Sequence, residues 1–210
     1  MKYFLFVKLT IDVYSVYMSV GSTAQRISSA ARNLLDKEGE EAVTMRRIAV
    51  AVGITPMAVY RHFPDRKGLL NALADEGFKE LNERPTASRC STDIEKRLTK
   101  ILDVHLDFAL QNPRLFELMF LKPREGSRQF PGDFKAGKSP TANLLAELIQ
   151  EGMETGYFRK DDVWEIVFEI GAMLQGLIML YLGGRVGTSA ARFRSLCHRS
   201  LRRYIRGIRK

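Results

Sequence analysis

Apolar residues recur every three or four positions over most of this chain, which is the spacing of amphipathic α-helices. Strand-like alternation is missing from the sequence, so the predicted fold class is all-α. The first convincing helix is followed by Gly39, a residue typical of the position just past a helix C-terminus. Its predicted inward face consists of Ile27, Ala30, Ala31, Leu34 and Leu35.

Two short helices flanking a glycine are predicted next. Thr44 is the expected N-cap of the first, which ends at Gly53. Thr55 then caps the second, with Pro56 at its first position, and this helix is expected to extend through Phe63. The inward face predicted for the first of the pair is Met45, Ile48, Ala49 and Val52.

The remaining chain also has helical patterns. A fourth helix is expected from about Arg66 to Asn82, and the proline- and glycine-rich residues 122–140 are predicted to be a loop inside a second domain. The later helices are predicted at 93–110, 113–121, 140–156, 162–183 and 189–207. The predicted organisation is an uncertain N-terminal extension (1–20), a first helical domain with two short helices joined by a turn (21–82), a linker (83–92) and a second, larger helical domain (93–210).

The first twenty residues are apolar in patches, but Lys8 and Asp12 interrupt them and no cleavage-site pattern follows. A secretory signal is therefore not expected. Met18 stands just before the first helix, so this segment is interpreted either as an over-extended start or as a disordered arm. No function is assigned to it.

Composition narrows the function. The chain has 210 residues with 45% hydrophobic residues, enough to fill a core. Its 33 Lys and Arg against 24 Asp and Glu give a net charge of +9, which favours contact with phosphate in nucleic acid or in lipid headgroups. Cys90 and Cys197 lie far apart without redox or metal-ligand spacing, so a reducing cytoplasm is the expected setting.

The short helix pair is locally basic. Two helices joined by a glycine turn brace each other while the second inserts its N-terminal residues into the DNA major groove. Val59 and Phe63 are expected to face the core, so Met57 and Tyr60 should point outward with parts of Pro56 and Ala58. Between Thr44 and Lys67 the positively charged side chains are Arg46, Arg47, Arg61, Arg66 and Lys67. His62 can add to this positive charge, and Asp65 is the only acidic residue in the same stretch.

The segment TMRRIAVAVGITPMAVYRHFPDRKGLL resembles the helix-turn-helix of the TetR family, in which Ile-Ala, a turn Gly and Tyr-x-His-Phe recur at these spacings. The resemblance implies a sequence-specific DNA-binding transcriptional regulator. It places Arg46 where relatives contact a base or a phosphate, and Thr44 and Tyr60 at phosphate-contacting positions. The predicted DNA-binding residues are Thr44, Arg46, Arg47, Thr55, Pro56, Met57, Ala58, Tyr60, Arg61, His62, Arg66 and Lys67.

Some residues depart from the family pattern, so not every role can be carried over from relatives. Met57 and Ala58 stand where Gly-Thr or similar small pairs are common, so the operator sequence is not inferred; Met57 is a candidate contact for a thymine methyl. Lys67 replaces a common acid and is expected to strengthen non-specific binding. The alternatives are a solvated helix face for Arg46 and Arg47, and a capping or packing role for His62.

The second domain contains an apolar run, Ile166 to Leu182, near the lower length limit for a membrane span. Glu169 inside it would be costly in hydrocarbon, so a helix buried by a cavity and a partner subunit is favoured over a span. The last helix carries eight cations from Arg192 to Lys210 and no acid, beside an apolar stripe. It is interpreted as packing in a dimer with its arginines in water.

A mostly apolar ligand pocket is predicted between the helices of this domain, the alternative being a plain packed core. The stretch NPRLFELMF at 112–120 and Gln175 loosely resemble a family subset, although Gln175 departs from the subset's histidine. The predicted lining is Leu102, His105, Leu106, Phe116, Met119, Phe120, Leu145, Phe168, Met173 and Leu177. The effector that it would bind is unknown but expected to be small and largely apolar.

These features together predict a cytoplasmic repressor that dimerises through its last two helices, binds double-stranded DNA at a palindromic operator and is released by its effector. The competing hypothesis is a helical ligand-binding or membrane-surface protein without specific DNA binding. Catalysis is not expected, because no paired carboxylates, nucleophile-His-acid grouping or phosphate loop occur in the sequence. No cofactor is predicted, and the adjacent Cys197 and His198 cannot both face one metal from a helix.

Overall fold

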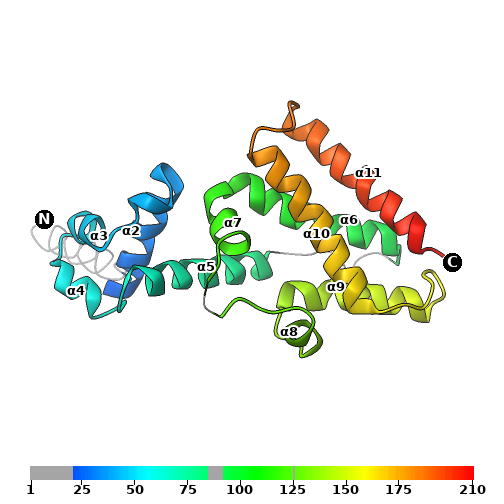
Figure 1. Cartoon of the computed structure of the whole chain (residues 1–210), viewed down its shortest axis with the longest axis horizontal. Coiled ribbons are helices and arrows are strands. Elements are labelled where there is room, and N and C mark those ends of the chain that lie inside the picture. The colour runs from blue at the N-terminus through cyan, green and yellow to red at the C-terminus, as the bar shows by residue number, and fades with distance from the viewer. Residues whose placement is uncertain (1–20, 85–91, 125) are drawn as a thin grey trace, which may run out of the picture. The chain divides into compact units, whose positions relative to one another are not determined.

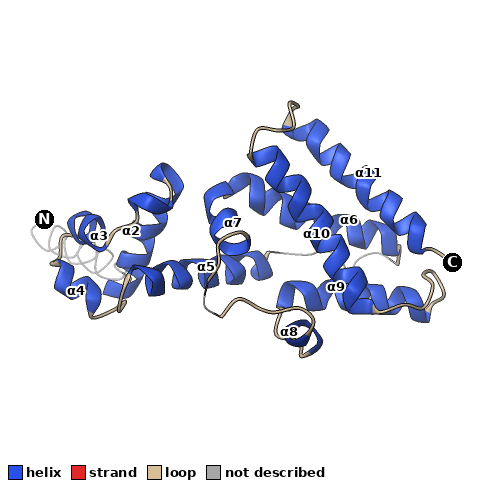
Figure 2. Ribbon diagram, viewed as in Figure 1, coloured by secondary structure: helices blue, strands red, loops and turns tan. Residues whose placement is uncertain are grey.

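The structure is a computed structural model that describes residues 21–84, 92–124 and 126–210. The predicted extension (1–20) and most of the predicted linker (83–92) lie outside the described residues, so both stay predictions. Every regular element in the described ranges is a helix, apart from one isolated bridge between Phe158 and Arg209 (Figures 1 and 2). The all-α prediction is confirmed.

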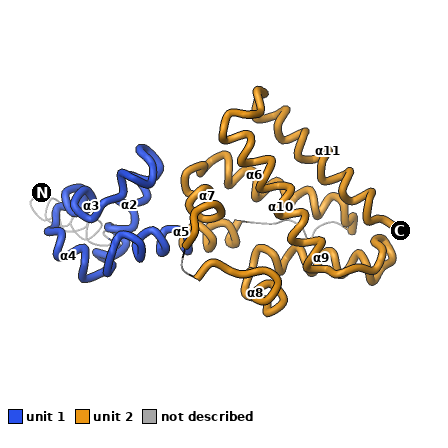
Figure 3. Tube along the Cα trace, in the orientation of Figure 1, with its two compact units in different colours: residues 1–75 blue, residues 76–210 orange. Residues whose placement is uncertain are grey.

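The chain forms two compact units, which divide between Asp75 and Glu76 (Figure 3). This division lies inside one helix, α5, so residues of that helix belong to both units. The elements of the first unit are α2 (Thr23–Glu38), the 3-10 turn η1 (Glu40–Ala42), α3 (Met45–Val52), α4 (Pro56–Tyr60) and the beginning of α5 (Arg66–Glu83).

Local sequence signals fix the ends of these helices. Ser22 and Gln25 form a capping box, in which the Gln25 N–H donates to Ser22 Oγ (3.3 Å) and the Ser22 N–H to Gln25 Oε1 (2.7 Å). Gly39 ends α2 with φ +95° and donates its N–H to the Leu35 carbonyl (2.9 Å). The helix predicted from its apolar spacing therefore begins and ends at residues that satisfy its terminal groups.

One boundary prediction is wrong: α4 ends at Tyr60 and does not extend through Phe63. The amides of His62 and Phe63 both donate to the Val59 carbonyl at 3.0 Å, which tightens the last turn and ends the helix. Pro64 gives the reason, because a proline disfavours the helical conformation of the residue before it. A short helix followed by a turn results.

The second unit contains six further helices besides its part of α5, counted over the described residues. Their bounds are α6 (Ile94–Gln111), α7 (Pro113–Phe120), α8 (Gly132–Lys135), α9 (Pro140–Glu154), α10 (Val163–Leu182) and α11 (Ala190–Ile208). The segment 122–140, predicted as a plain loop, contains the single turn α8. That turn is held by Asp133, which accepts from the Gln129 N–H and the Lys138 ammonium, both at 2.8 Å.

Helix α6 is central to the second unit and packs against α7, α9, α10 and α11. Its Leu106 and Phe108 are fully buried, as is Phe193 of α11. Arg194 of α11 pairs with both Asp103 (2.6 Å) and Asp107 of α6. An ion-pair network thus joins these two packed helices.

Helix α10 is long and apolar enough to cross a membrane when judged by length and composition alone. In the structure it packs against α6, α9 and α11 of the same unit. The hydroxyl of Tyr204 on α11 donates to the Glu169 carboxylate on α10. The charge of Glu169 was the argument against a membrane span, and in the structure this residue takes part in the packing of α10 against α11.

Candidate nucleic-acid interface and ligand cavity

The turn between α3 and α4 has the geometry that the sequence predicts. Thr44 Oγ1 accepts from the Arg47 N–H, and Thr55 Oγ1 from the Ala58 N–H, each at 3.3 Å. Gly53 adopts a left-handed conformation with φ +74°, which favours a residue without a side chain. Two short capped helices are therefore joined through a tight turn, the arrangement of a helix-turn-helix.

Burial separates the two faces of this pair. Ile48 of α3 and Val59 of α4 are fully buried, whereas Met57 is 67% and Tyr60 46% exposed. The predicted inward and outward faces therefore agree with the structure. Of the other predicted DNA-contacting residues, Thr44, Ala58 and Arg66 are half-buried, and those that are exposed are Arg46, Arg47, Thr55, Pro56, Arg61, His62 and Lys67.

An exposed apolar residue of this surface was missed by the sequence interpretation. Val50 of α3 is 77% exposed, the highest value among the large hydrophobic residues described as exposed. Its position between the buried Ala49 and Val52 takes it off the inward face of α3, and that spacing was the available signal. With Met57, it gives the unit two exposed apolar side chains able to contact thymine methyl groups.

Two of the predicted DNA-contacting arginines also bind protein groups. Arg47 forms a bidentate pair with the Glu38 carboxylate at 2.9 and 2.6 Å. Arg66 donates from Nε to the Val43 carbonyl (2.8 Å) and from Nη2 to the Glu40 carbonyl (2.7 Å). The Arg66 guanidinium therefore ties the start of α5 to η1, and a phosphate contact by either arginine stays a prediction.

We expect Arg66→Lys to lower the free energy of unfolding by about 1–2 kcal/mol, because a compact ammonium cannot reproduce the two-pronged bonding to both carbonyls. Thermal unfolding followed by circular dichroism measures this change. Lys67→Arg, at the adjacent exposed cation, is the control and should stay within about 0.5 kcal/mol of the parent. Equal stability of Arg66→Lys and the parent protein would contradict the structural role.

The second unit encloses a cavity of about 380 Å³. Seven of the predicted pocket residues line it, namely Leu102, His105, Phe116, Met119, Phe120, Leu145 and Phe168. The prediction is wrong for three residues that do not line the cavity, Leu106, Met173 and Leu177. Helix α6 lines the cavity with Leu98, Ile101, Leu102 and His105. Leu106 lies on a neighbouring face of α6 and is buried in the core. Met173 and Leu177 likewise lie off the α10 face that carries Ile170, Leu174 and Ile178.

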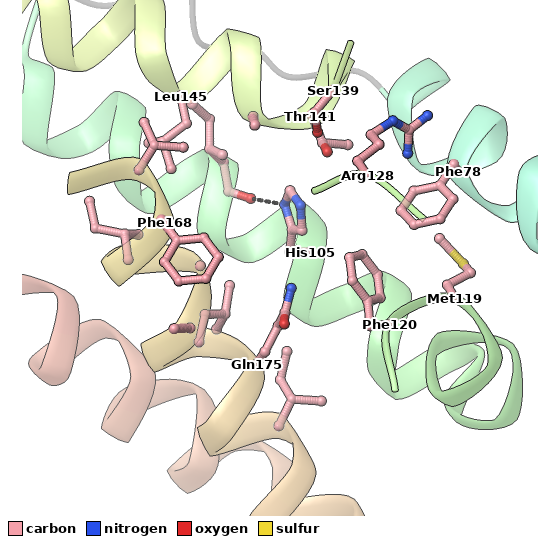
Figure 4. Close-up of a pocket in the computed structure, with 18 of the residues that line it drawn as sticks. Phe78, His105, Met119, Phe120, Arg128, Ser139, Thr141, Leu145, Phe168 and Gln175 are labelled. Carbon is pink, nitrogen blue, oxygen red and sulfur yellow. Dashed lines mark hydrogen bonds between the residues drawn. The ribbon is translucent and has the colours of Figure 1, made fainter. Parts of the chain in front are cut away.

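His105 and Gln175 supply neutral polar groups to the cavity (Figure 4). His105 Nδ1 lies 3.2 Å from the Ile101 carbonyl, which can only accept, so Nδ1 carries the proton and Nε2 remains an acceptor. Burial lowers the pKa of His105 below its ordinary value. The imidazole is therefore neutral at pH 7 and adds no charge.

Lining residues that the sequence interpretation missed include Phe78 of α5 and three cations that follow α7. These cations, Lys122, Arg124 and Arg128, belong to the segment predicted as a loop. A run of positive residues in a loop was visible in the sequence, but only the folded chain brings it to the cavity. Over the described residues, no group of His, Cys, Asp or Glu side chains is arranged to hold a metal ion.

Comparison with known proteins gives two family matches. Residues 27–73 match the description "Bacterial regulatory proteins, tetR family", and residues 98–204 match "Tetracyclin repressor-like, C-terminal domain". The first match covers α3, the turn and α4, and the second covers most of the unit that contains the cavity. Together they span the two candidate sites.

Individual relatives agree with these matches. The chain is 34% identical over 103 residues to the nucleoid occlusion factor SlmA of Haemophilus influenzae, covering 48% of this chain and 47% of SlmA. The chain thus spans about half the length of SlmA. It is 23% identical over 161 residues to the uncharacterized HTH-type transcriptional regulator YobS of Bacillus subtilis, covering 77% and 80% of the two chains.

Among solved structures, the fold is similar to that of the TetR family transcriptional regulator PfmR from Thermus thermophilus. The TM-score is 0.63 at 22% sequence identity, and the match covers 91% of this chain and 100% of PfmR. The likeness therefore extends over both units of the fold.

Proposed function

Because the chain belongs to the tetR family of bacterial regulatory proteins, we propose that it is a DNA-binding transcriptional regulator that represses the genes beside its operator. The observation that carries this proposal is the exposed face of the helix pair, where Met57 and Tyr60 of α4 and the cation Arg46 of α3 are all exposed. Apolar and cationic side chains on one short helix pair suit thymine methyl groups, guanine edges and phosphates. Such a protein acts where the chromosome is, in the bacterial cytoplasm.

A homodimer through α10 and α11 is part of the proposal. Four large apolar side chains of α10, Phe168, Met179, Leu180 and Leu182, are exposed in the single chain, and a partner subunit would bury them. A two-fold dimer holds two recognition helices about one DNA turn apart, roughly 34–36 Å, and so fits a palindromic operator.

The cavity of the second unit is the proposed effector site. Its volume of about 380 Å³ lies in the range of sites for small molecules. An effector releases the repressor only if it binds the DNA-free conformation more tightly than the DNA-bound one. Ligand binding and operator binding should therefore weaken each other by the same factor.

We expect the dimer to select a palindromic sequence from a random pool of duplexes, and Arg46→Ala to weaken binding of that sequence about tenfold, the effect of losing one base or phosphate contact. Fluorescence anisotropy with the selected duplex measures the affinity. Tyr60→Phe should weaken it less, because one hydroxyl contact is lost.

The matched control is Lys37→Ala, which removes an exposed cation at the end of α2 outside the predicted interface. It should leave the affinity within about twofold of the parent, since the expected charge effect is long-range and screened. Failure to select any sequence, together with equal effects of Arg46→Ala and Lys37→Ala, would favour the competing hypothesis of a helical ligand-binding protein.

A further inference from the structure

Among the described residues, the charged side chains that line the cavity are positive and come from one segment. Lys122, Arg124 and Arg128 lie between α7 and α8, and within the described ranges no Asp or Glu lines the cavity. The other side chains of the lining are uncharged at pH 7, including His105, whose pKa burial lowers. The cavity is therefore polarised, with its positive charge at one end.

Arg128 is held in place from two sides. Its Nε donates to the Lys138 carbonyl (2.6 Å), and its guanidinium lies over the Phe78 ring, 5.0 Å from the centroid. Arg124 lies over the same ring at 5.2 Å. The Nε bond uses one of five guanidinium donors, and the other four belong to the two terminal nitrogens. A fixed guanidinium of this kind suits a carboxylate or phosphate, which accepts two parallel bonds.

Two carboxylates close to this segment are paired with lysines, and Asp133 also interacts electrostatically with Arg128. Asp133 accepts from the Lys138 ammonium and the Gln129 N–H, each at 2.8 Å, and it does not line the cavity. Glu117 lies 3.7 Å from the Lys122 ammonium and offsets that charge. Arg128, whose hydrogen bond and ring contact are to uncharged groups, is therefore the principal positive group at this end of the cavity.

The opposite end is apolar. Figure 4 shows Arg128 and Phe78 on one side of the cavity, Phe168 and Leu145 on the other, and His105 between them. Phe168 stacks on Phe130, with ring centroids 4.3 Å apart, so an aromatic pair stands at the apolar end. Ser139 and Thr141 add hydroxyl groups near Arg128 (Figure 4).

We propose that the effector is an amphipathic anion, an apolar chain with one negatively charged end group, whose anion is bound by Arg128 with Arg124 beside it. This assignment rests on the proposed role of the cavity as the effector site and adds the chemical class of the ligand. The anion is a carboxylate, as in a free fatty acid, or a phosphate, as in a phosphorylated lipid. The chain occupies the end bounded by Leu145 and Phe168, where burial of apolar surface favours it.

The test is calorimetric titration of the full-length protein with four probes that share one chain: dodecanoate, dodecyl phosphate, dodecanol and dodecylammonium. We expect at least one of the two anions to bind about 10- to 100-fold more tightly than dodecanol, as a charge-assisted hydrogen bond provides, and dodecylammonium to bind most weakly. Whichever of the two anions binds more tightly identifies the charged end group of the effector as a carboxylate or a phosphate.

Arg128→Gln should abolish the preference for the anion while leaving the affinity for dodecanol unchanged. The matched control is Arg185→Gln, at an exposed arginine that does not line the cavity, and it should keep the preference. Equal affinity of the parent protein for dodecanol and both anions would overturn the inference, as would an equal loss of all four probes in Arg128→Gln.

Binding of the selected duplex by the same preparations separates this inference from the proposed function. Intact duplex binding without an anion preference rejects the amphipathic anion and leaves the regulator standing. If the parent protein does not bind any duplex sequence selectively, the proposal of a DNA-binding regulator is rejected, whichever of the four probes binds.

Discussion

Raising the salt concentration from about 50 to about 200 mM should weaken operator binding roughly ten-thousandfold, because each phosphate contact releases condensed counterions. If each protomer neutralises about four phosphates, the dimer neutralises about eight, and the slope of log affinity against log salt is about −7. The candidates for these contacts are exposed cations of the first unit, among them Arg46 and Arg61. Fluorescence anisotropy over a salt series gives the slope.

A variant series shows whether the slope comes from the predicted surface. Arg46→Ala and Arg61→Ala should each make the slope shallower by about 2 if that residue contacts a phosphate, because the homodimer loses the contact in both subunits. Arg192→Ala removes an exposed cation of α11 in the other unit and should leave the slope unchanged. A slope that depends on Arg192 instead would transfer DNA binding to the arginine-rich helix α11 and reject α4 as the principal contact.

Gly152→Ala should destabilise the protein by about 3 kcal/mol, the upper part of the range for overpacking a filled core. Gly152 lies on α9, and a Cβ atom there would come within 2.5 Å of the Phe158 ring carbon Cε2. Phe158 is fully buried, and its N–H donates to the Gly152 carbonyl at 2.9 Å, so the ring cannot move away without losing packing. Thermal and urea unfolding measure the change.

Gly207→Ala is the matched control, because Gly207 also lies in a helix but a Cβ atom there meets nothing within 4 Å. Alanine favours the helix over glycine, so this variant should be neutral or more stable by up to about 1 kcal/mol. A loss in Gly207→Ala as large as that in Gly152→Ala would show that the expected effect is not steric. The pair therefore tests the close approach of Phe158 to α9.

The two predictions concern different parts of one mechanism. The salt slope reports on charges that the first unit presents to a phosphate backbone, and these are exposed and screened. The glycine pair reports on the packing of α9, whose Thr141 and Leu145 line the cavity. A regulator needs both, because an effector acts only through a cavity whose walls differ between two conformations.

Residue order alone is enough to predict the helices of the first unit and the pattern of their faces. Thr44, Gly53, Thr55 and Pro56 act through local hydrogen bonds and backbone preferences, so their roles follow from order along the chain. The inward and outward faces of α3 and α4 follow from helical periodicity for the same reason. The end of α4 was predicted wrongly, because the apolar Phe63 fits the helical spacing of apolar residues whereas Pro64 causes the helix to end earlier.

Contacts between residues far apart in the sequence depend instead on how the helices pack in three dimensions. Arg66 stands beside the recognition segment in sequence, yet its donors reach carbonyls of η1 and Val43 more than twenty residues away. The cavity is lined by residues from three segments that are distant in the sequence, among them Phe78, Arg128 and Phe168. Helical periodicity does not predict how far each helix is rotated about its own axis in the packed unit. That rotation places Leu106 in the core and His105 in the cavity, although the two are neighbours in the sequence.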